Sequence, residues 1–468
     1  MRLDLQMMLD TTDDHIPPLP SYTLSPLPPI SPIVSDQLFA LLIPIVAYWV
    51  VSLGFHILDV YDLGSKYRLH TPAEVLKRNH VTRGEVLRDV LLQQLIQTVF
   101  GLAIGMLDPV ETIGRELYDL ARLARLIRRA TGYVPAILAV GGVDTAKLSS
   151  KIAGPYPTMA GVLLGGRYPH LTQEISNIAG KTVLVPGFAP WELLAARLMY
   201  WLLIPAIQFG TAMFIVDTWQ YFWHRAMHMN KWLYTNLHSR HHRLYVPYAF
   251  GALYNHPGEG FLLDTLGAGI AYLVTRMTTR QGMWFFTFST VKTIDDHCGY
   301  AFPWDPLQYL TSNNAAYHDV HHQSWGIKTN FSQPFSTFWD RLLGTAWSGG
   351  DVSARYERAR QAAQKKVDEG DAAAVSAQKT MVNTPRIDLQ RAVEQAAASQ
   401  QQVLQDKVSG GPQVIEQERL EEMEARLRPR KRSIRKTSRF DSRSEGLRGL
   451  TGRVSNAVPS YCPNLHPS

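Results

Sequence analysis

An uncharged apolar run near the start of the chain constrains its structure more than any other feature. Residues 37–58, QLFALLIPIVAYWVVSLGFHIL, contain no Asp, Glu, Lys or Arg. About 20 consecutive apolar residues cross a bilayer as an α-helix. A spanning segment must satisfy all its backbone polar groups internally, so only helices and closed barrels can span. We therefore predict a transmembrane helix at 37–58, in which Pro44 is tolerated as a kink.

Further apolar runs follow along the chain. Residues 90–107 form a weaker second run, and residues 198–223 form a long third run with one acid, Asp217. Residues 261–294 hold two apolar runs separated by RMTTRQG, a pattern that favours a helical hairpin entering the membrane and returning. The alternative is a large buried helical core in a soluble enzyme. Several long runs in one chain favour an all-α integral membrane protein with multiple passes.

The two ends of the chain differ in composition from the apolar middle. Residues 1–35 contain seven prolines and predict a disordered leader. Residues 351–468 hold 21 basic against 15 acidic side chains, so six of the seven net positive charges lie in this low-complexity basic tail. We expect the tail to be mostly disordered. Because the basic charge is confined to it, the charge does not indicate a nucleic-acid partner.

Two basic segments have open interpretations. In residues 111–132, Leu117, Leu120 and Leu123 recur at helical spacing among arginines, which fits an amphipathic helix on an anionic membrane surface. A plain solvated helix fits equally well. The segment RLRPRKRSIRKTSR at 426–439 could bind lipid headgroups, although a solvated disordered tail is the favoured reading.

Histidines indicate the chemistry of the chain. Ten of its 16 histidines lie between 224 and 322. They occur in the clusters HRAMH, HSRHH and HDVHH and at two single positions: His224 and His228; His238, His241 and His242; His318, His321 and His322; and His256 and His297. Residues at i and i+4 share one face of a helix, so each cluster directs at least two imidazoles the same way. Unpaired buried polar groups cost about 1–3 kcal/mol each, so the pattern predicts a metal site.

The number of histidines suggests two metal ions. Imidazole suits zinc, copper, iron and nickel, but a catalytic zinc needs only about three protein ligands. The chain has no HExxH motif and only two cysteines, Cys298 and Cys462. A histidine-rich two-metal site beside membrane helices suits iron and dioxygen. Four acids near the histidines could orient the imidazoles or could be plain caps and surface acids: Asp217, Asp295, Asp296 and Asp319.

The order of the segments suggests a lipid substrate. The third apolar run ends at Trp223, directly before His224, and the hairpin at 261–294 ends before Asp295. Both groups of histidines should therefore emerge on one membrane face. The reactive carbon of a lipid could reach such a site while its chain stays in the apolar region.

The three clusters resemble the histidine boxes of the fatty acid hydroxylase (sterol desaturase-like) superfamily, H-x3-H, H-x2-HH and H-x2-HH. The resemblance covers about 190–350. Longer stretches look like the sphingolipid (sphinganine) C4-hydroxylases of fungi and plants: HHRLYVPYAFGALYNHPGEG, DDHCGYAFPWDP, NNAAYHDVHHQSWGIKTNFSQPF and WDRLLGT. This similarity implies a helical catalytic domain with two iron ions on one membrane face. The eight box histidines would be ligands, with His256 and His297 as the ninth and tenth.

The resemblance also implies a reaction. Two electrons from NAD(P)H would arrive through a reductase and cytochrome b5, and one oxygen atom of O2 would enter C4 of sphinganine or dihydroceramide as a hydroxyl. The products would be phytosphingosine or phytoceramide. The segment HPGEG at 256–260 is similar to the haem motif of cytochrome b5, but Glu259 replaces its last glycine and no haem domain fits, so cytochrome b5 should be a separate partner. The family implies residence in the endoplasmic reticulum membrane.

These observations give the expected domains and the rival functions. We expect a leader at 1–35, a membrane region with an amphipathic loop at 36–190, a catalytic domain at 191–350 and the tail at 351–468. The rivals within the superfamily are a sterol C4-methyl oxidase, a sterol C5-desaturase and a fatty acyl 2-hydroxylase. More distant rivals are a zinc-dependent membrane hydrolase and a non-catalytic metal-binding scaffold.

Overall fold

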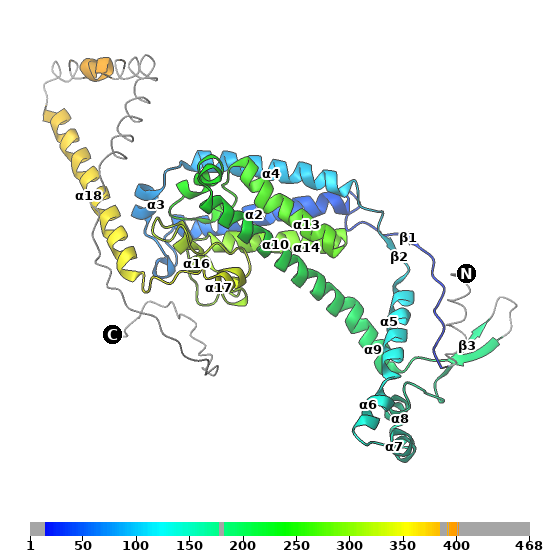
Figure 1. Ribbon diagram of the computed structural model, residues 1–468. Helices are drawn as coiled ribbons and strands as arrows, with labels where there is room; N and C mark the ends of the chain where they lie inside the picture. Colours follow the sequence, from blue (N-terminus) through cyan, green and yellow to red (C-terminus); the bar gives the residue numbers. More distant parts are fainter. Residues whose placement is uncertain (1–14, 177–181, 384–390, 392, 400, 402–468) are drawn as a thin grey trace, which may run out of the picture. The chain divides into compact units, whose positions relative to one another are not determined.

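The computed structural model describes residues 15–176, 182–383, 391, 393–399 and 401. This part of the chain is mostly helical, as predicted, and it also contains two short antiparallel strand pairs (Figure 1). The chain divides into one compact unit, Met1–Val375, and a second, Ser376–Ser468. The basic run at 426–439 lies outside the described residues.

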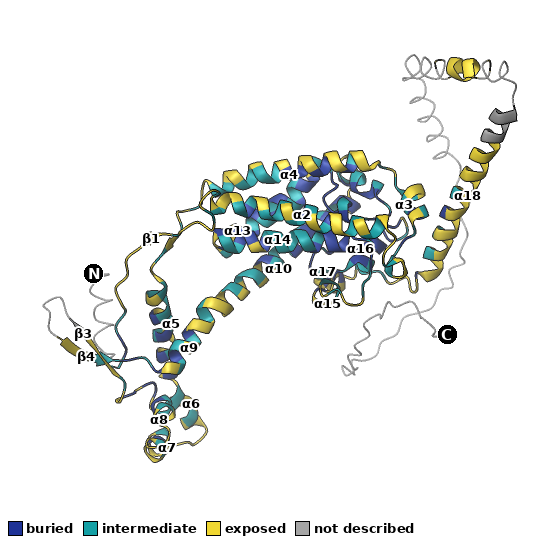
Figure 2. Ribbon diagram, turned by 180° about the vertical axis from the view of Figure 1, so that it is seen from behind, coloured by how far each residue is buried: buried dark blue, intermediate teal, exposed yellow. Residues whose placement is uncertain are grey.

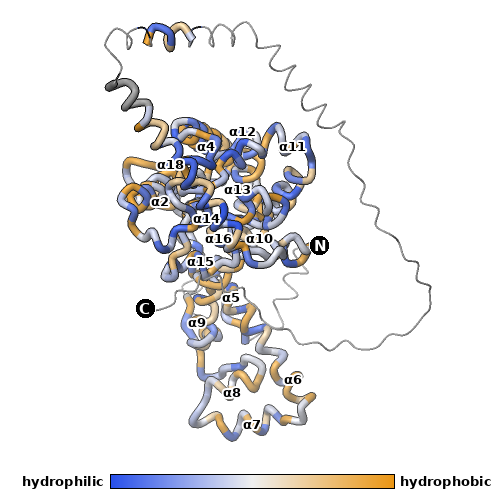
Figure 3. Tube along the Cα trace, turned by 90° about the vertical axis from the view of Figure 1, so that its left-hand side faces the viewer, coloured by the Kyte–Doolittle hydropathy of each residue, from blue (hydrophilic) through white to orange (hydrophobic). Residues whose placement is uncertain are grey.

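Helix α2 (Asp36–Val60) is the first predicted membrane helix. The Ser35 hydroxyl accepts the N–H of Leu38 and caps the start of the helix, and Pro44 lies inside it. Much of its apolar surface is exposed; Val50, for example, is 64% exposed. Figure 3 shows hydrophobic residues along α2.

A second long helix is continuous from Pro190 to Met229. It consists of α9 (Pro190–Leu198), a π-helical turn η2 (Met199–Leu203) and α10 (Ile204–Met229). Within the described ranges, this helix and α2 are the two that are long and apolar enough to cross a membrane. Only 11% of the apolar stretch of this helix and 17% of that of α2 is buried, so both face outward rather than fill a core.

The other predicted apolar runs are also helical. Residues 90–107 lie mostly in α4 (Arg83–Gly105), and residues 261–294 lie in the π turn η5 (Phe261–Leu266), α13 (Gly267–Thr275) and α14 (Thr279–Asp296). A capping box of Thr278 and Gln281 begins α14. None of these helices combines the length and the hydropathy of α2. Length and hydropathy therefore do not support further membrane-spanning helices at these positions.

Close packing joins these helices into the body that carries the histidines. Helix α14 lies against α2, and α10 lies against α13 (Figure 1). Gly267 permits the second contact, because a Cβ at this position would lie 2.6 Å from the Trp219 ring. Figure 2 shows buried residues gathered where α10, α14 and α16 meet.

A further region precedes α10. Arg128 of α5 (Glu116–Thr131) forms a buried, bidentate ion pair with Glu192 of α9, with N–O distances of 2.5 and 2.6 Å. The predicted apolar stripe of α5 is only partly covered: Ala124 is buried, whereas Leu117 is 72% exposed.

Part of the Pro-rich leader is paired, since β1 (Ser25–Pro26) pairs with β2 (Thr112–Ile113).

The remaining elements are short, apart from the last. They are η1 (Ser65–Tyr67), α3 (Pro72–Arg78), α6 (Val134–Val140), α7 (Thr145–Ile152), α8 (Pro157–Leu163), β3 (Thr172–Ser176) paired with β4 (Thr182–Pro186), α11 (Lys231–Asn236), η3 (His238–Arg243), η4 (Ala249–Gly251), α12 (Pro257–Gly260), α15 (Leu307–Leu310), α16 (Ala315–His322), α17 (Phe338–Leu343) and α18 (Ser353–Asn383). Helix α18 thus occupies the first part of the predicted tail.

Candidate metal centre

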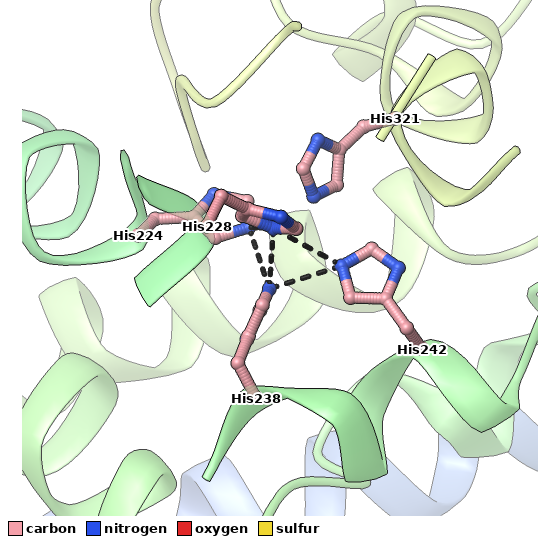
Figure 4. Close-up of side chains that lie close together, drawn as sticks. All are labelled: His224, His228, His238, His242 and His321. Atoms are coloured by element: carbon pink, nitrogen blue, oxygen red, sulfur yellow. Dashed lines mark hydrogen bonds between the residues drawn. The ribbon is translucent and has the colours of Figure 1, made fainter. Parts of the chain in front are cut away.

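The first group of histidines consists of five buried side chains. One turn of α10 directs His224 and His228 the same way, the 3-10 turn η3 supplies His238 and His242, and α16 supplies His321. Each offers one ring nitrogen, and these five nitrogens all lie within 4.8 Å of one another. Figure 4 shows the five imidazoles pointing toward one another.

The second group consists of four buried histidines. His241 comes from η3, His297 follows the end of α14, and His318 and His322 lie one turn apart on α16. Their ligand atoms also lie within 4.8 Å of one another. The two groups are adjacent, because the rings of His241 and His242 lie on neighbouring residues with centroids 5.6 Å apart.

His256 joins neither group, so the structure gathers nine of the ten predicted ligands. It is the N-cap of α12, and its Nδ1 atom accepts the Gly258 N–H at 3.1 Å. Pro257 begins the helix immediately after it, so the imidazole is turned toward its own backbone.

Hydrogen bonds at Nδ1 fix the orientation of most of these imidazoles. A carbonyl oxygen can only accept, so the Nδ1 atom of each such ring carries the proton. The bonds are His224 to Phe331 O at 2.8 Å, His241 to Tyr254 O at 3.0 Å, His297 to Thr293 O at 2.8 Å, His321 to Thr329 O at 2.7 Å and His322 to Leu244 O at 2.9 Å. The Nε2 lone pairs of these rings are therefore free to bind a cation.

Glu259 orients a sixth imidazole. Its Oε1 atom accepts the Nδ1–H of His238 at 2.5 Å, and both side chains are buried. A carboxylate that holds the second nitrogen of a ligating histidine fixes the ring and raises its basicity. In the sequence, Glu259 stands out only as part of the haem-like motif HPGEG, so its contact with His238 was not predicted.

The four acids singled out in the sequence have other partners. Asp217 accepts the backbone N–H groups of Phe335 and Ser336. Asp295 accepts from Gln308, and Asp296 pairs with Lys292 and accepts from Asn313. Asp319 accepts from His70 and Tyr356. In the hydrogen bonds of the described chain, these acids hold the surrounding loops and helices rather than the gathered imidazoles.

Burial keeps the histidines neutral. Burial, and then the neighbouring imidazoles, lowers the pKa of His238, His242 and His318 well below the usual range. A neutral imidazole is the form that binds a metal ion. The cluster is therefore in its ligating form at pH 7.

The nitrogen positions fit two metal ions. Neighbouring Nε2 atoms lie 2.7–3.3 Å apart in the first group and 3.0–3.1 Å apart along the His297–His318–His322 series of the second. Two nitrogens bound at right angles, each about 2.1 Å from a metal ion, would lie about 3.0 Å apart. The buried Nε2 atom of His321 has no hydrogen-bond partner within the described chain. Lone pairs directed at one another without a cation repel, so the donor set suits one ion in each group.

A hydrogen bond between distant segments of the chain holds α16 in place. His70, next to α3, donates from Nε2 to Asp319 at 2.9 Å and from Nδ1 to Glu74 at 3.0 Å. Burial acts to lower the pKa of His70, but the charges of Asp319 and Glu74 outweigh it and raise that pKa to about 9. Because 249 residues separate His70 from Asp319, local sequence patterns gave no sign of this pairing.

This contact should make stability depend on pH. The folded-state pKa of His70 lies above its ordinary value of 6.5, so its contribution to the free energy of unfolding is complete below about pH 6.5. That contribution is lost as the pH rises through about 9. The His70→Gln variant should lower the unfolding temperature of the detergent-solubilised protein more at pH 6 than at pH 9.5. An equal decrease at both values would show that the charge of His70 contributes nothing.

A small cavity of about 20 Å³ lies beside the centre. Its lining includes His241, His297, Gln220 and Asp264. Asp264 lies in the π turn η5, a distortion that is frequent at functional sites. Its carboxylate accepts from Gln220 at 3.2 Å and from Asn255 at 3.3 Å. Polar groups are thus gathered next to the nitrogens of the second group.

Comparison with known proteins identifies the class of this centre. The model of the Fatty acid hydroxylase family matches residues 209–345, the segment that contains both histidine groups. Sphingolipid C4-hydroxylase SUR2 of Saccharomyces cerevisiae is 40% identical over 344 residues, which cover 74% of this chain and 81% of that enzyme. Sphingolipid C4-hydroxylase sur2 of Schizosaccharomyces pombe is 43% identical over 308 residues, or 65% of this chain and 87% of that enzyme.

The chain therefore belongs to the fatty acid hydroxylase family, within its group of sphingolipid C4-hydroxylases. Methylsterol monooxygenase 1 of Rattus norvegicus matches over less: it is 36% identical over 198 residues, or 41% of this chain and 62% of that enzyme. No solved structure matches the chain.

Proposed function

We propose that this chain is a membrane monooxygenase that hydroxylates C4 of sphinganine or dihydroceramide. One oxygen atom of O2 enters the C4–H bond as a hydroxyl, and the other leaves as water with two electrons and two protons. The observation that carries the proposal is the pair of buried, neutral imidazole groups, in a chain that covers 81% of a sphingolipid C4-hydroxylase at 40% identity. The sterol enzymes are less favoured, because their relative matches a smaller part of the chain.

The nine gathered histidines are proposed to hold two iron ions. His224, His228, His238, His242 and His321 would hold one, and His241, His297, His318 and His322 the other. When bound, iron supplies the activation of dioxygen. The protein keeps the imidazoles neutral by burial and fixes their rings through main-chain carbonyls and Glu259. Imidazole is also a good zinc ligand, so metal content separates this proposal from a zinc hydrolase.

The polar groups that line the cavity beside the centre suit the polar end of a sphingoid lipid. The carboxylate of Asp264 and the amide of Gln220 can meet hydroxyl and nitrogen groups, which a sphingoid base carries on C1, C2 and C3, on one side of C4. Burial removes water from these groups and strengthens each hydrogen bond that the lipid makes there. Asp264 and Gln220 would thus hold C4 toward the histidines.

The partners, location and domains follow from the same proposal. The electrons would come from NAD(P)H through a separate cytochrome b5 and its reductase, and the chain would be a multi-pass protein of the endoplasmic reticulum membrane. The catalytic domain would occupy 191–350, and the tail at 351–468 would lie outside the chemistry except where Tyr356 of α18 bonds to Asp319.

A lipid profile tests the function. The chain should be expressed in a host that lacks 4-hydroxylated long-chain bases, and the lipids should be measured by mass spectrometry. Phytosphingosine or phytoceramide should appear with the unaltered chain and not with an empty vector. Unchanged long-chain bases with the protein present in membranes would refute the proposal, and a changed sterol fraction in the same extract would favour the sterol enzymes.

A further inference from the structure

A second cavity, of about 190 Å³, continues from the metal centre. It shares Gln220, Asp264, Thr293 and Pro334 with the cavity beside the histidines. Its walls come from α2, α4, α13 and α14, and they are mainly apolar in the middle: Leu41, Ile45, Phe100, Ile104, Ala268 and Phe286. It is therefore an apolar space that begins at the reacting centre.

The helices that line this cavity give its length. On α14 the lining extends from Thr293, near the centre, to Thr279 at the other end of the helix. Fourteen helical residues advance about 21 Å, and the eleven residues from Gln94 to Gly105 on α4 advance about 16 Å. A C–C bond of about 1.5 Å in a zigzag advances about 1.3 Å per carbon, so the lining runs along a length of about 12–16 extended carbons.

Polar groups line the far end of the cavity. The Tyr272 hydroxyl donates to the carboxylate of Asp108 at 2.8 Å, and both residues line the cavity. The nearby N–H of Thr279 donates to Glu111 at 2.5 Å. An alkyl chain that passed this point would bury these groups without replacing their hydrogen bonds, which is unfavourable.

We propose that this cavity holds the single alkyl chain of the lipid beyond its reacting carbon, and that the Tyr272–Asp108 pair limits the length of the chain. This inference rests on the proposed function for the identity of the lipid. Its lining follows α4 and α14 for about 16–21 Å, the elongated form that an extended, unbranched chain takes.

Gly105 is the position at which the cavity can be shortened. A Cβ at Gly105 would have no neighbour nearer than the Gln37 side chain at 3.9 Å, so a leucine can extend into open space at the far end. The matched control is Gly84→Leu, because Gly84 lies on the same helix, does not line the cavity and has no atom within 4 Å of its ideal Cβ position.

The test measures kcat/KM for sphinganines of 14, 16, 18, 20 and 22 carbons. Each methylene that no longer fits loses its burial in the cavity, which lowers kcat/KM about fourfold. Gly105→Leu should therefore lower the kcat/KM of the 18-carbon base, relative to that of the 14-carbon base, at least about tenfold. Gly84→Leu should leave this ratio unchanged. Tyr272→Leu should act in the opposite direction and improve the use of the 20- and 22-carbon bases.

The outcomes separate this inference from the proposed function. An equal loss at every chain length in Gly105→Leu, or no shift in either cavity variant, would overturn the inference. If the unaltered chain hydroxylates no long-chain base, the function fails, and the cavity is tested by mass spectrometry of the lipids that co-purify. Gly105→Leu should then retain shorter chains than Gly84→Leu, and identical distributions would overturn the inference.

Discussion

The His241→Ala variant should lose C4 hydroxylation, with product falling at least about 100-fold, and should bind less iron than the unaltered chain. His241 is one of only four imidazoles in the second group, and its ring is fixed by the Tyr254 carbonyl. Alanine removes a ligand. Replacing a residue that only orients a ligand already lowers metal affinity or activity about 10–100-fold. Iron per protein chain and phytosphingosine per milligram of membrane protein are the two measurements.

The matched control is His256→Ala. This histidine lies in the same part of the chain but outside both groups, where it caps α12. Its replacement should leave iron content and product close to those of the unaltered chain. Normal activity in His241→Ala, or loss of iron in His256→Ala, would contradict the assignment of nine ligands.

The Glu259→Ala variant should lose about 10–100-fold in iron affinity or activity, although Glu259 belongs to neither group. Its carboxylate holds the Nδ1–H of His238 at 2.5 Å in a buried position. Without it the ring can turn, and the buried donor is left unpaired, which costs about 1–3 kcal/mol. Loss of iron to a competing chelator measures the affinity, and lipid mass spectrometry measures the activity.

The Glu259→Gln variant distinguishes orientation from packing. The amide oxygen of glutamine can still accept the Nδ1–H of His238, so this variant should keep much more iron than Glu259→Ala. Equal loss in both variants would mean that the negative charge, rather than the hydrogen bond, is what His238 requires. Full iron retention in Glu259→Ala would show that the contact has no role in metal binding.

Spacing along the sequence was enough to find the ligands that share a helix. His224 and His228 on α10, and His318 and His322 on α16, are four residues apart and point the same way, as helical periodicity requires. The apolar runs likewise predicted helices, and α2 matches its predicted range closely. These features are local, so local patterns determine them.

The division of the histidines into two groups was not predictable. His241 and His242 are adjacent, yet they contribute to different groups, and His238 shares a group with His242 although side chains at i and i+3 of a 3-10 turn eclipse. No local pattern indicates that η3 is a 3-10 turn. His256 lies apart from both groups, since Pro257 begins a helix and leaves the imidazole as its cap.

The residues that hold the ligands and α16 in place were not predicted, because they are distant in sequence or belong to a motif with another interpretation. His70 reaches Asp319 across 249 residues, and no periodicity connects such positions. Glu259 lies only 21 residues from His238, but it stands in a haem-like motif that suggests a different role. A buried acid in an apolar stretch that follows two histidine clusters was the available signal.

The sharing of short elements between the groups has a mechanical consequence. Turn η3 gives His238 and His242 to one group and His241 to the other, and α16 likewise gives His321 to one and His318 and His322 to the other. Neither element can shift without moving nitrogens in both groups. The two ion positions are therefore coupled through rigid backbone, so a disturbance at one is transmitted to the other without any bridging side chain.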